Sequence, residues 1–190
     1  MKNSKKCSES HTVMTNIVLP NETNSLNNMF GGELLARMDR AAAIAASRHS
    51  QSTVVTASVN HVSFKHPIPE GGVVVVEAQV SRAFSTSMEI YCDVWLDNPI
   101  TKEKIHTNEG IYTFVAVDKN NHPVAIPELI PQSDVEKARF DAALRRKELS
   151  LILSGKMKAQ DSIELKKLFG STIYCKVVDS LSCKTVKLQF

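Results

Sequence analysis

Apolar positions recur with a helical period over one stretch, from Asn24 to His49. A polar loop leads into a double glycine, Gly31 and Gly32, and a run rich in leucine and alanine follows. This pattern predicts an amphipathic helix that ends near His49 and Ser50. The side chains of its many alanines are short, which would allow a sheet to pack closely against the helix.

Five further segments show features of β-strands. The alternation of apolar and polar side chains is clearest over residues 86–96. Short turns, such as the one rich in Pro and Gly at residues 67–72, predict antiparallel neighbours. One long helix followed by four strands predicts an α+β fold in which a curved antiparallel sheet wraps around the helix. The predicted strands span residues 11–19, 53–64, 73–80, 86–96 and 104–117.

The character of the chain changes after residue 123. Ser133 and Glu136 form a capping-box pattern, which predicts a helix that reaches about residue 153. The basic side chains of this helix favour a solvated face over contact with substrate phosphates. The predicted organisation is a flexible leader over residues 1–8, a main domain over 9–123, a linker and basic C-terminal helix over 124–154, and a tail of unknown role over 155–190. Within the tail, residues 162–169 predict a short helix and 172–190 two short strands.

Composition excludes several classes of protein. The net charge of +3 is too small to indicate a nucleic-acid partner. No secretory signal is visible, and no apolar run approaches the ~20 residues of a membrane-spanning helix. The cysteines lack paired spacing, which favours reduced thiols over a zinc site or a disulfide framework. The sequence therefore predicts a cytoplasmic protein without a metal. The cysteines are Cys7, Cys92, Cys175 and Cys183.

Asp39 is unusual among the polar residues of the predicted helix because it lies on the apolar side. A carboxylate there is costly unless something pairs with it. Asp39 is therefore either an acid at the rim that reaches water or a catalytic carboxylate in a groove. Its neighbours three and four positions away are Leu35, Ala36, Ala42 and Ala43.

The double glycine has two interpretations. At the start of a helix, free backbone N–H groups point outward and the helix dipole favours negative charge. Gly31 and Gly32 would let a ligand oxygen approach these groups, so the site suits an anion or a carbonyl that becomes one. The alternative is that the pair forms only a flexible turn before the helix.

Other common chemistries lack their sequence patterns. There is no Gly-x-Ser-x-Gly elbow for a serine nucleophile and no glycine-rich phosphate loop after a strand. His61 and His66 are an odd number of residues apart, so on one strand they would face opposite ways and could not share a metal.

Several motifs, in this order and spacing, resemble the acyl-CoA thioesterase family of the hot-dog fold. This family includes small bacterial acyl-CoA hydrolases and the repeated domains of a brain acyl-CoA hydrolase. The match covers about residues 9–123, with a looser fit to about 153. It rests on Pro20-Asn21-Glu22-Thr23-Asn24, Phe30-Gly31-Gly32, Met38-Asp39, Val55-Thr56-Ala57-Ser58-Val59 and Phe64-Lys65-His66-Pro67-Ile68.

The resemblance implies a hot-dog domain over residues 9–123, an antiparallel sheet wrapped around one long helix, with the C-terminal helix as an addition. It also implies that two subunits pair into one continuous sheet with the active sites between them. Such dimers commonly assemble into a trimer of dimers, a hexamer.

The implied activity is hydrolysis of acyl-CoA thioesters to free fatty acid and CoA, without a cofactor. Family members use a loop asparagine and a helix acid from opposite subunits, which match Asn24 and Asp39. The family's glycine pair falls on Gly31 and Gly32, where it would bind the thioester carbonyl. Whether Asp39 acts as general base or as nucleophile stays open.

A weaker part of the resemblance concerns CoA binding. In relatives, a loop that matches residues 82–87 helps to seat the pantetheine arm, which points to Ser85 and Ser87. The family usually has glycine where Phe84 or Ser85 stands here, so this departure weakens the assignment.

Two other functions stay open: a non-catalytic acyl-CoA sensor, and a hot-dog hydratase or dehydratase. Hot-dog sensors carry an added DNA-binding helix pair, for which the predicted leader is too short. The hydratases use a helix histidine or an Asp–His pair, and Asp39 has no histidine on its own helix face. The acyl-chain preference cannot be inferred from the sequence.

Overall fold

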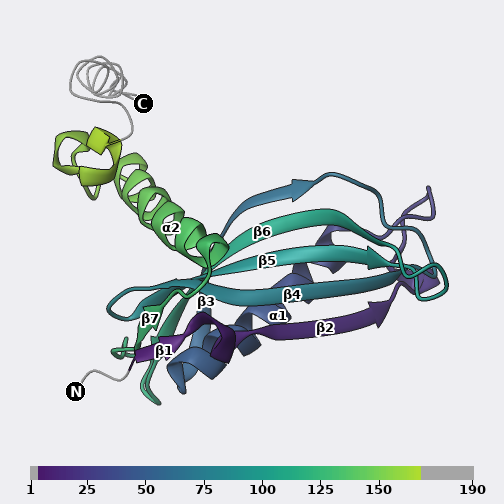
Figure 1. The fold of residues 1–190 in the computed structure, drawn as a ribbon, viewed down its shortest axis with the longest axis horizontal. Coiled ribbons are helices and arrows are strands. Elements are labelled where there is room, and N and C mark those ends of the chain that lie inside the picture. The colour runs from purple at the N-terminus through teal and green to yellow at the C-terminus, as the bar shows by residue number, and fades with distance from the viewer. Residues whose placement is uncertain (1–3, 168–190) are drawn as a thin grey trace, which may run out of the picture. The chain divides into compact units, whose positions relative to one another are not determined.

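The computed structural model describes residues 4–167 of the chain. The chain divides into two units, Met1–Lys137 and Ala138–Phe190. The first unit contains the long helix and the main sheet (Figure 1). In the second unit the chain is helical at residues 163–167, within the predicted short helix. The two strands predicted over residues 172–190 lie outside the described residues.

The first unit is built from helix α1 (Gly31–Ser50) and a five-stranded sheet that wraps around it (Figure 1). The strand order is β2-β4-β5-β6-β3, and every neighbouring pair is antiparallel. The α+β arrangement predicted from the sequence is therefore confirmed. The strands are β2 (Thr12–Ile17), β3 (Thr53–Phe64), β4 (Val73–Ala83), β5 (Ser87–Asp97) and β6 (Lys104–Val117).

The core lies between α1 and the inner face of the sheet. The alanines of α1 that face the sheet have no exposed surface, so the helix backbone lies close to the strands. Gly110 of β6 continues this close packing, because a Cβ there would lie 2.6 Å from the terminal methyl carbon of Met38. The short alanine side chains thus form the face of the helix that packs against the sheet, as predicted. The alanines are Ala41, Ala42, Ala45 and Ala46.

Strand β3 forms one edge of the sheet, beyond β6. Among the described residues, no other strand pairs with its outer side. Val55, Val59 and Phe64 of β3 have exposed fractions of 45%, 46% and 56%. An edge strand that carries exposed apolar side chains is a ready template for pairing with another strand.

The described part of the leader predicted over residues 1–8 forms a short strand and the start of a 3₁₀ turn. Strand β1 (Ser4–Lys6) pairs in parallel with β7 (Glu128–Ile130), inside the segment predicted as a linker. A 3₁₀ turn (Cys7–Ser10) follows, and the buried Ser10 hydroxyl accepts a hydrogen bond from the N–H of Val80 at 3.0 Å. Strands of three residues are too short to show an alternation, so the sequence pattern did not reveal them.

Helix α2 (Asp134–Leu153) begins with the predicted capping box. The hydroxyl of Ser133 accepts from the N–H of Glu136 at 3.2 Å, and the Glu136 carboxylate accepts from the N–H of Ser133 at 3.0 Å. Within the second unit, the Glu148 carboxylate accepts from the Ser162 hydroxyl and the Glu164 N–H. These bonds join the helix to the segment that follows it.

Of the four cysteines, Cys7 and Cys92 are buried free thiols, while Cys175 and Cys183 lie outside the described residues. None of the helices in the described part of the chain has both the length and the hydropathy of a membrane span.

Gly72, at the start of β4, provides a test of the packing. A Cβ at this position would lie 2.9 Å from the Pro69 carbonyl oxygen and 2.9 Å from the Leu96 side chain. Because a backbone atom cannot move aside easily, we expect Gly72→Ala to destabilise the fold by about 1–3 kcal/mol. Thermal denaturation at fixed protein concentration measures this loss.

Gly32→Ala is the matched control for the glycine test. A Cβ on Gly32 meets no atom within 4 Å, and alanine favours a helix more than glycine. The control should therefore melt at the same temperature or slightly higher. Equal melting temperatures for Gly72→Ala and the wild type would contradict the packing described at the β4 start.

Candidate active site

The loop that precedes α1 is anchored by an ion pair with the helix. The Glu22 carboxylate accepts hydrogen bonds from the guanidinium group of Arg37 at 2.6 Å and from the N–H of Leu19 at 2.8 Å. Arg37 also donates to the Ile17 carbonyl oxygen at 3.2 Å and is 5% exposed. Arg37 is buried because the loop folds back over it. The pair fixes the start of the loop.

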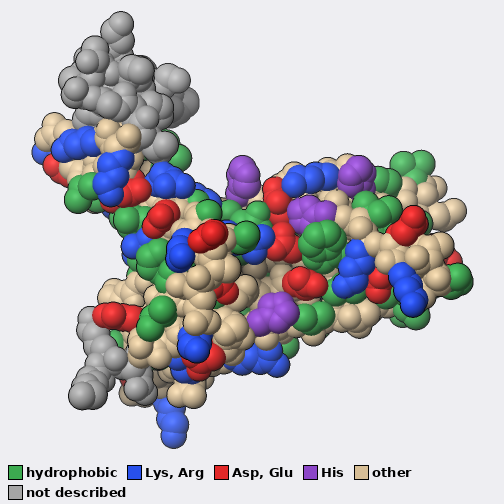
Figure 2. Space-filling view, in the orientation of Figure 1, with side chains coloured by type: hydrophobic (Ala, Val, Ile, Leu, Met, Phe, Trp, Pro, Cys, Tyr) green, Lys and Arg blue, Asp and Glu red, His purple; other side chains and the backbone are tan. Residues whose placement is uncertain are grey.

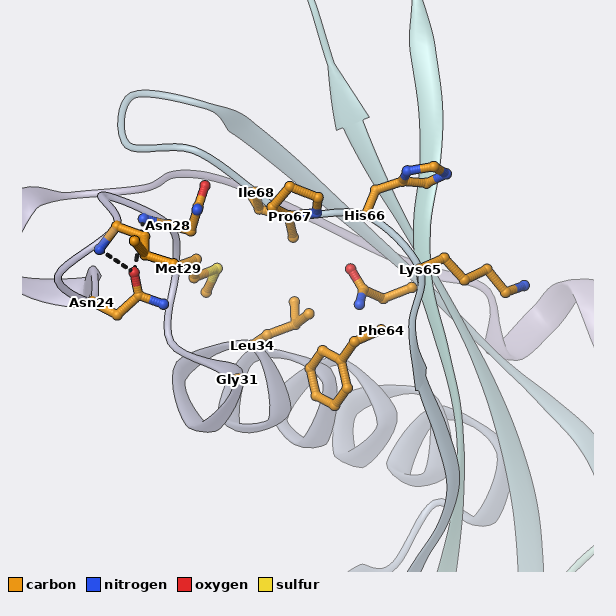
Figure 3. A pocket seen from close by; sticks show the side chains of 12 residues that line it. Asn24, Asn28, Met29, Gly31, Leu34, Phe64, Lys65, His66, Pro67 and Ile68 are labelled. Carbon is orange, nitrogen blue, oxygen red and sulfur yellow. Dashed lines mark hydrogen bonds between the residues drawn. The ribbon is translucent and has the colours of Figure 1, made fainter.

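The side chain of Asn24 is oriented by its own loop. Its Oδ1 accepts from the N–H of Leu26 at 2.9 Å and from the N–H of Asn28 at 3.3 Å. The Nδ2 group has no partner among the described residues, and it faces the hollow shown in Figure 3. Since the oxygen is engaged, the amide can offer only its N–H donors to a ligand.

The start of α1 is open to a ligand. Phe30 occupies the N-cap position and makes no side-chain hydrogen bond to the helix. The first N–H groups of a helix have no partner within it, so those of Gly31 and Gly32 are available. A Cβ on Gly32 would meet nothing within 4 Å, while one on Gly31 would lie 3.3 Å from the Phe64 ring. The positive end of the helix dipole is therefore accessible here.

Asn24 and Gly31 line one hollow between the loop, the start of α1 and the end of β3. We call it the helix-start hollow, and it is open to solvent. Figure 3 shows that Lys65 and His66 point away from it. The structure thus brings together the predicted asparagine and the predicted carbonyl-binding glycine. Other lining residues include Met29, Leu34, Phe64 and Asn108.

Asp39 lies elsewhere in the protomer, beside the exposed edge strand. Its Oδ1 accepts from the hydroxyl of Thr56 on β3 at 2.9 Å. Eight residues separate Asp39 from Gly31, which corresponds to about 12 Å along the helix. The hydroxyl of Tyr112 donates to the Leu35 carbonyl oxygen at 3.2 Å and so ties this turn of the helix to the sheet.

Thr56, the partner of Asp39, was not predicted from the sequence. Thr56 belongs to one of the motifs that carry the family resemblance, but a hydroxyl in a strand does not reveal which helix residue it meets. The contact depends on the tertiary packing of β3 against α1.

Ser85 and Ser87, predicted to seat the pantetheine arm, lie far from the helix-start hollow within one protomer. Ser87 pairs with Val115 on β6, and Asn108, which lines the hollow, is seven residues away along that strand. This spacing corresponds to about 23 Å. The structure therefore does not bring these serines together with Asn24 in a single subunit.

One group of side chains in the described residues could hold a metal ion. The ligand atoms of Asp93, His106 and Glu109 lie within 4.8 Å of one another. Asp93 contacts His106 at 3.1 Å, and Lys65 contacts Glu109 at 3.0 Å. The hydrogen bond from Lys65 holds the pKa of Glu109 below its ordinary value. A metal ion would have to displace this ammonium group.

Acidic, basic and histidine side chains are interspersed over the part of the sheet seen in Figure 2. This mixture agrees with the Lys65–Glu109 ion pair and the hydrogen bond between Asp93 and His106.

Comparisons with known proteins identify the family. The thioesterase superfamily model matches residues 26–102. An uncharacterised acyl-CoA thioester hydrolase of Bacillus subtilis is 36% identical over 140 residues, which cover 74% of this chain and 81% of that protein. The chain belongs to the acyl-CoA thioesterase family. The predicted membership, and with it the hot-dog fold, is confirmed.

Solved structures of family members agree with this assignment. The acyl-CoA hydrolase of Staphylococcus aureus, in complex with butyryl-CoA, CoA and CoA disulfide, is 35% identical; the alignment has a TM-score of 0.75 and covers 80% of this chain and 95% of that one. A hexameric acyl-CoA thioesterase is 38% identical, with a TM-score of 0.77 and coverage of 80% and 97%. For the staphylococcal enzyme, structures also exist with an asparagine, an aspartate or a threonine replaced by alanine.

The Glu22–Arg37 pair predicts a specific acid sensitivity. The N–H of Leu19 and the guanidinium of Arg37 favour the carboxylate, so the pKa of Glu22 is lowered from 4.5 in the folded chain. Between the two pKa values the unfolded chain binds more protons than the folded one, so stability rises with pH. The stabilisation of the folded chain by the Glu22 carboxylate is complete above about pH 4.5, and it is lost as the pH falls through the lowered pKa.

We expect Glu22→Gln to destabilise the protein by about 1–3 kcal/mol at neutral pH, because Arg37 loses a charged partner. The variant should also lose less stability than the wild type as the pH falls below 4.5. Urea denaturation at a series of pH values measures both effects, with the exposed Glu70→Gln as control. Parallel pH profiles for the wild type and Glu22→Gln would contradict the proposed anchor.

Proposed function

We propose that this chain hydrolyses acyl-CoA thioesters to free fatty acid and CoA, at sites that two protomers build together. Asp39 of one protomer is the catalytic carboxylate, and the helix-start hollow of the other holds the thioester carbonyl. One observation carries this proposal: Asp39 lies about 12 Å along α1 from Gly31. A single protomer therefore cannot place its carboxylate beside a carbonyl bound at its own helix start.

The free edge of β3 supplies a way to join the two halves. Antiparallel pairing of two β3 strands centred near Asn60 would place Thr56 of one protomer beside the partner subunit's Phe64. Phe64 lines the hollow and Thr56 bonds to Asp39, so this register would bring Asp39 to the partner's hollow. The exposed apolar side chains of β3 support such pairing.

A trimer of these dimers is the larger assembly that we propose. The support is the hexameric state of one related thioesterase that shares the fold of this chain.

The chemistry follows from the donors and acceptors of the two halves. The N–H of Gly32 polarises the thioester carbonyl and stabilises the oxyanion that develops on it. Asn24, whose Oδ1 is held by the loop, donates from Nδ2 to the carbonyl or to the attacking water. Ser85 and Ser87 remain candidates for the pantetheine arm on the strength of the resemblance alone.

Asp39 activates the nucleophile. As a general base it takes a proton from water, the hydroxide oxygen attacks the carbonyl carbon, and the carbon–sulfur bond breaks to release the CoA thiolate, which then takes up a proton. As a nucleophile, the carboxylate would instead form an anhydride, which water then hydrolyses. The hydrogen bond from Thr56 to Oδ1 orients the carboxylate and leaves Oδ2 for the reaction.

The staphylococcal relative provides independent support for these three residues. The asparagine, aspartate and threonine replaced in its variant structures are separated by fifteen and by seventeen residues. Asn24, Asp39 and Thr56 have the same two separations in this chain.

Thiol release from a panel of acyl-CoA chain lengths tests the activity, because neither a sensor nor a hydratase liberates CoA. We expect Asp39→Ala to lose about 10²- to 10⁴-fold in kcat while staying folded, since a general base has been removed. Asn24→Ala should lose less. A fully active Asp39→Ala variant would end the assignment.

Mixing these two variants tests the shared site. If opposite subunits supply Asn24 and Asp39, each mixed dimer contains one intact site and one site with both changes. Co-expression of Asn24→Ala with Asp39→Ala should therefore restore about a quarter of wild-type activity. Activity no greater than the average of the two variants would show that both residues act within one protomer.

The orientation of the Asn24 amide predicts an unusual substitution pattern. Asn24→Asp keeps an acceptor for the N–H groups of Leu26 and Asn28, but replaces the Nδ2 donor with a negatively charged oxygen. We expect its kcat to be at or below that of Asn24→Ala, although its melting temperature should be at or above that of the alanine variant. An Asn24→Asp enzyme with near wild-type kcat would show that no Nδ2 donor is needed.

A further inference from the structure

Asn108 is a polar residue in the wall of the helix-start hollow that the proposed chemistry does not use. It belongs to β6, and only 1% of its surface is exposed. Its Nδ2 donates to the Ser63 carbonyl oxygen at 3.3 Å. Its Oδ1 is buried and accepts no hydrogen bond from the described residues.

An amide oxygen that is cut off from water and lacks a donor is costly, and such atoms are rare in folded proteins. Met29, Leu34 and Phe64 of the lining carry no N–H or O–H donor, and the Asn24 amide, which also lines the hollow, makes no hydrogen bond to Oδ1. Lys65 and His66 line the same hollow, but their side chains point away from it (Figure 3). A ligand that brings a donor into the hollow would therefore satisfy Oδ1.

The chemistry of the substrate limits what that donor can be. An acyl chain has no hydrogen-bond donor, and the thioester carbonyl only accepts. The thiol arm of CoA carries a secondary amide, and its N–H is a few bonds from the thioester sulfur. This N–H is the nearest donor to the reacting bond.

We propose that Oδ1 of Asn108 accepts a hydrogen bond from the amide N–H nearest the sulfur in the thiol arm of the substrate. The inference rests on the proposed function and adds a binding contact to it. The bond fixes the thiol arm on the floor of the hollow, while the carbonyl lies at the start of α1. Asn108 thereby selects thioesters whose thiol carries an amide over thioesters of simple alkyl thiols.

Two thioesters with the same acyl group test this contact: one of N-acetylcysteamine, which has the amide, and one of an alkyl thiol of matched length. We expect the wild type to prefer the amide-bearing thioester by about 10-fold in kcat/KM. Asn108→Leu, close in size but without an acceptor, should reduce this preference to nearly one. Asn108→Ala carries the same test if the leucine variant does not fold.

Thr107→Val is the matched control, because Thr107 is the neighbouring buried polar residue of β6 and does not line the hollow. Its preference for the amide-bearing thioester should equal that of the wild type. A uniform fall for both thioesters in the Asn108 variants, with an unchanged ratio, would overturn the proposal and leave Asn108 a structural role.

The two proposals fail in different ways. If the wild type released no thiol from any acyl-CoA, the proposal that this chain hydrolyses acyl-CoA would be rejected. The Asn108 contact would still be tested by calorimetric binding of the matched thioether analogues, which cannot be hydrolysed. Equal loss of affinity for both analogues in Asn108→Leu would overturn it there as well.

Discussion

The close packing of α1 against the inner face of the sheet is the constraint on which the rest of the structure depends. Four alanines of the helix have no exposed surface, and Gly110 leaves room for Met38 beneath them. The hydroxyl of Tyr112 adds a polar link between the sheet and the helix backbone. Because the helix is held along its length, its first turn and the turn of Asp39 keep a fixed separation.

That fixed separation divides the candidate site between two parts of the surface. The helix-start hollow has donors for an oxyanion, whereas Asp39 and Thr56 lie beside the open edge of β3. In the proposed mechanism, each part supplies half of what thioester hydrolysis requires. Under the proposed pairing of β3 edges, the same contact that extends the sheet also completes the site, so assembly and catalysis are coupled.

Features that follow from local periodicity could be predicted from the sequence. Features that depend on tertiary contacts could not. The alternation of β5 and the capping box of α2 were readable because each depends on local spacing. The burial of Arg37 was not, since it requires Glu22 on a loop whose path no pattern reveals. The Thr56–Asp39 contact and the pairing of β1 with β7 join segments far apart in the chain. The unpaired oxygen of Asn108 becomes visible only when its surroundings are known.

The exposed edge of β3 has a consequence for folding inside a cell. Under the proposed pairing, a chain that has folded but has not yet met its partner presents unpaired backbone groups and the apolar side chains of Val55 and Val59. Any extended peptide could pair with such an edge, so newly made chains risk aggregation until the edge is covered. Subunit association would then act as protection for the nascent protein, and its speed would set how long each chain remains vulnerable.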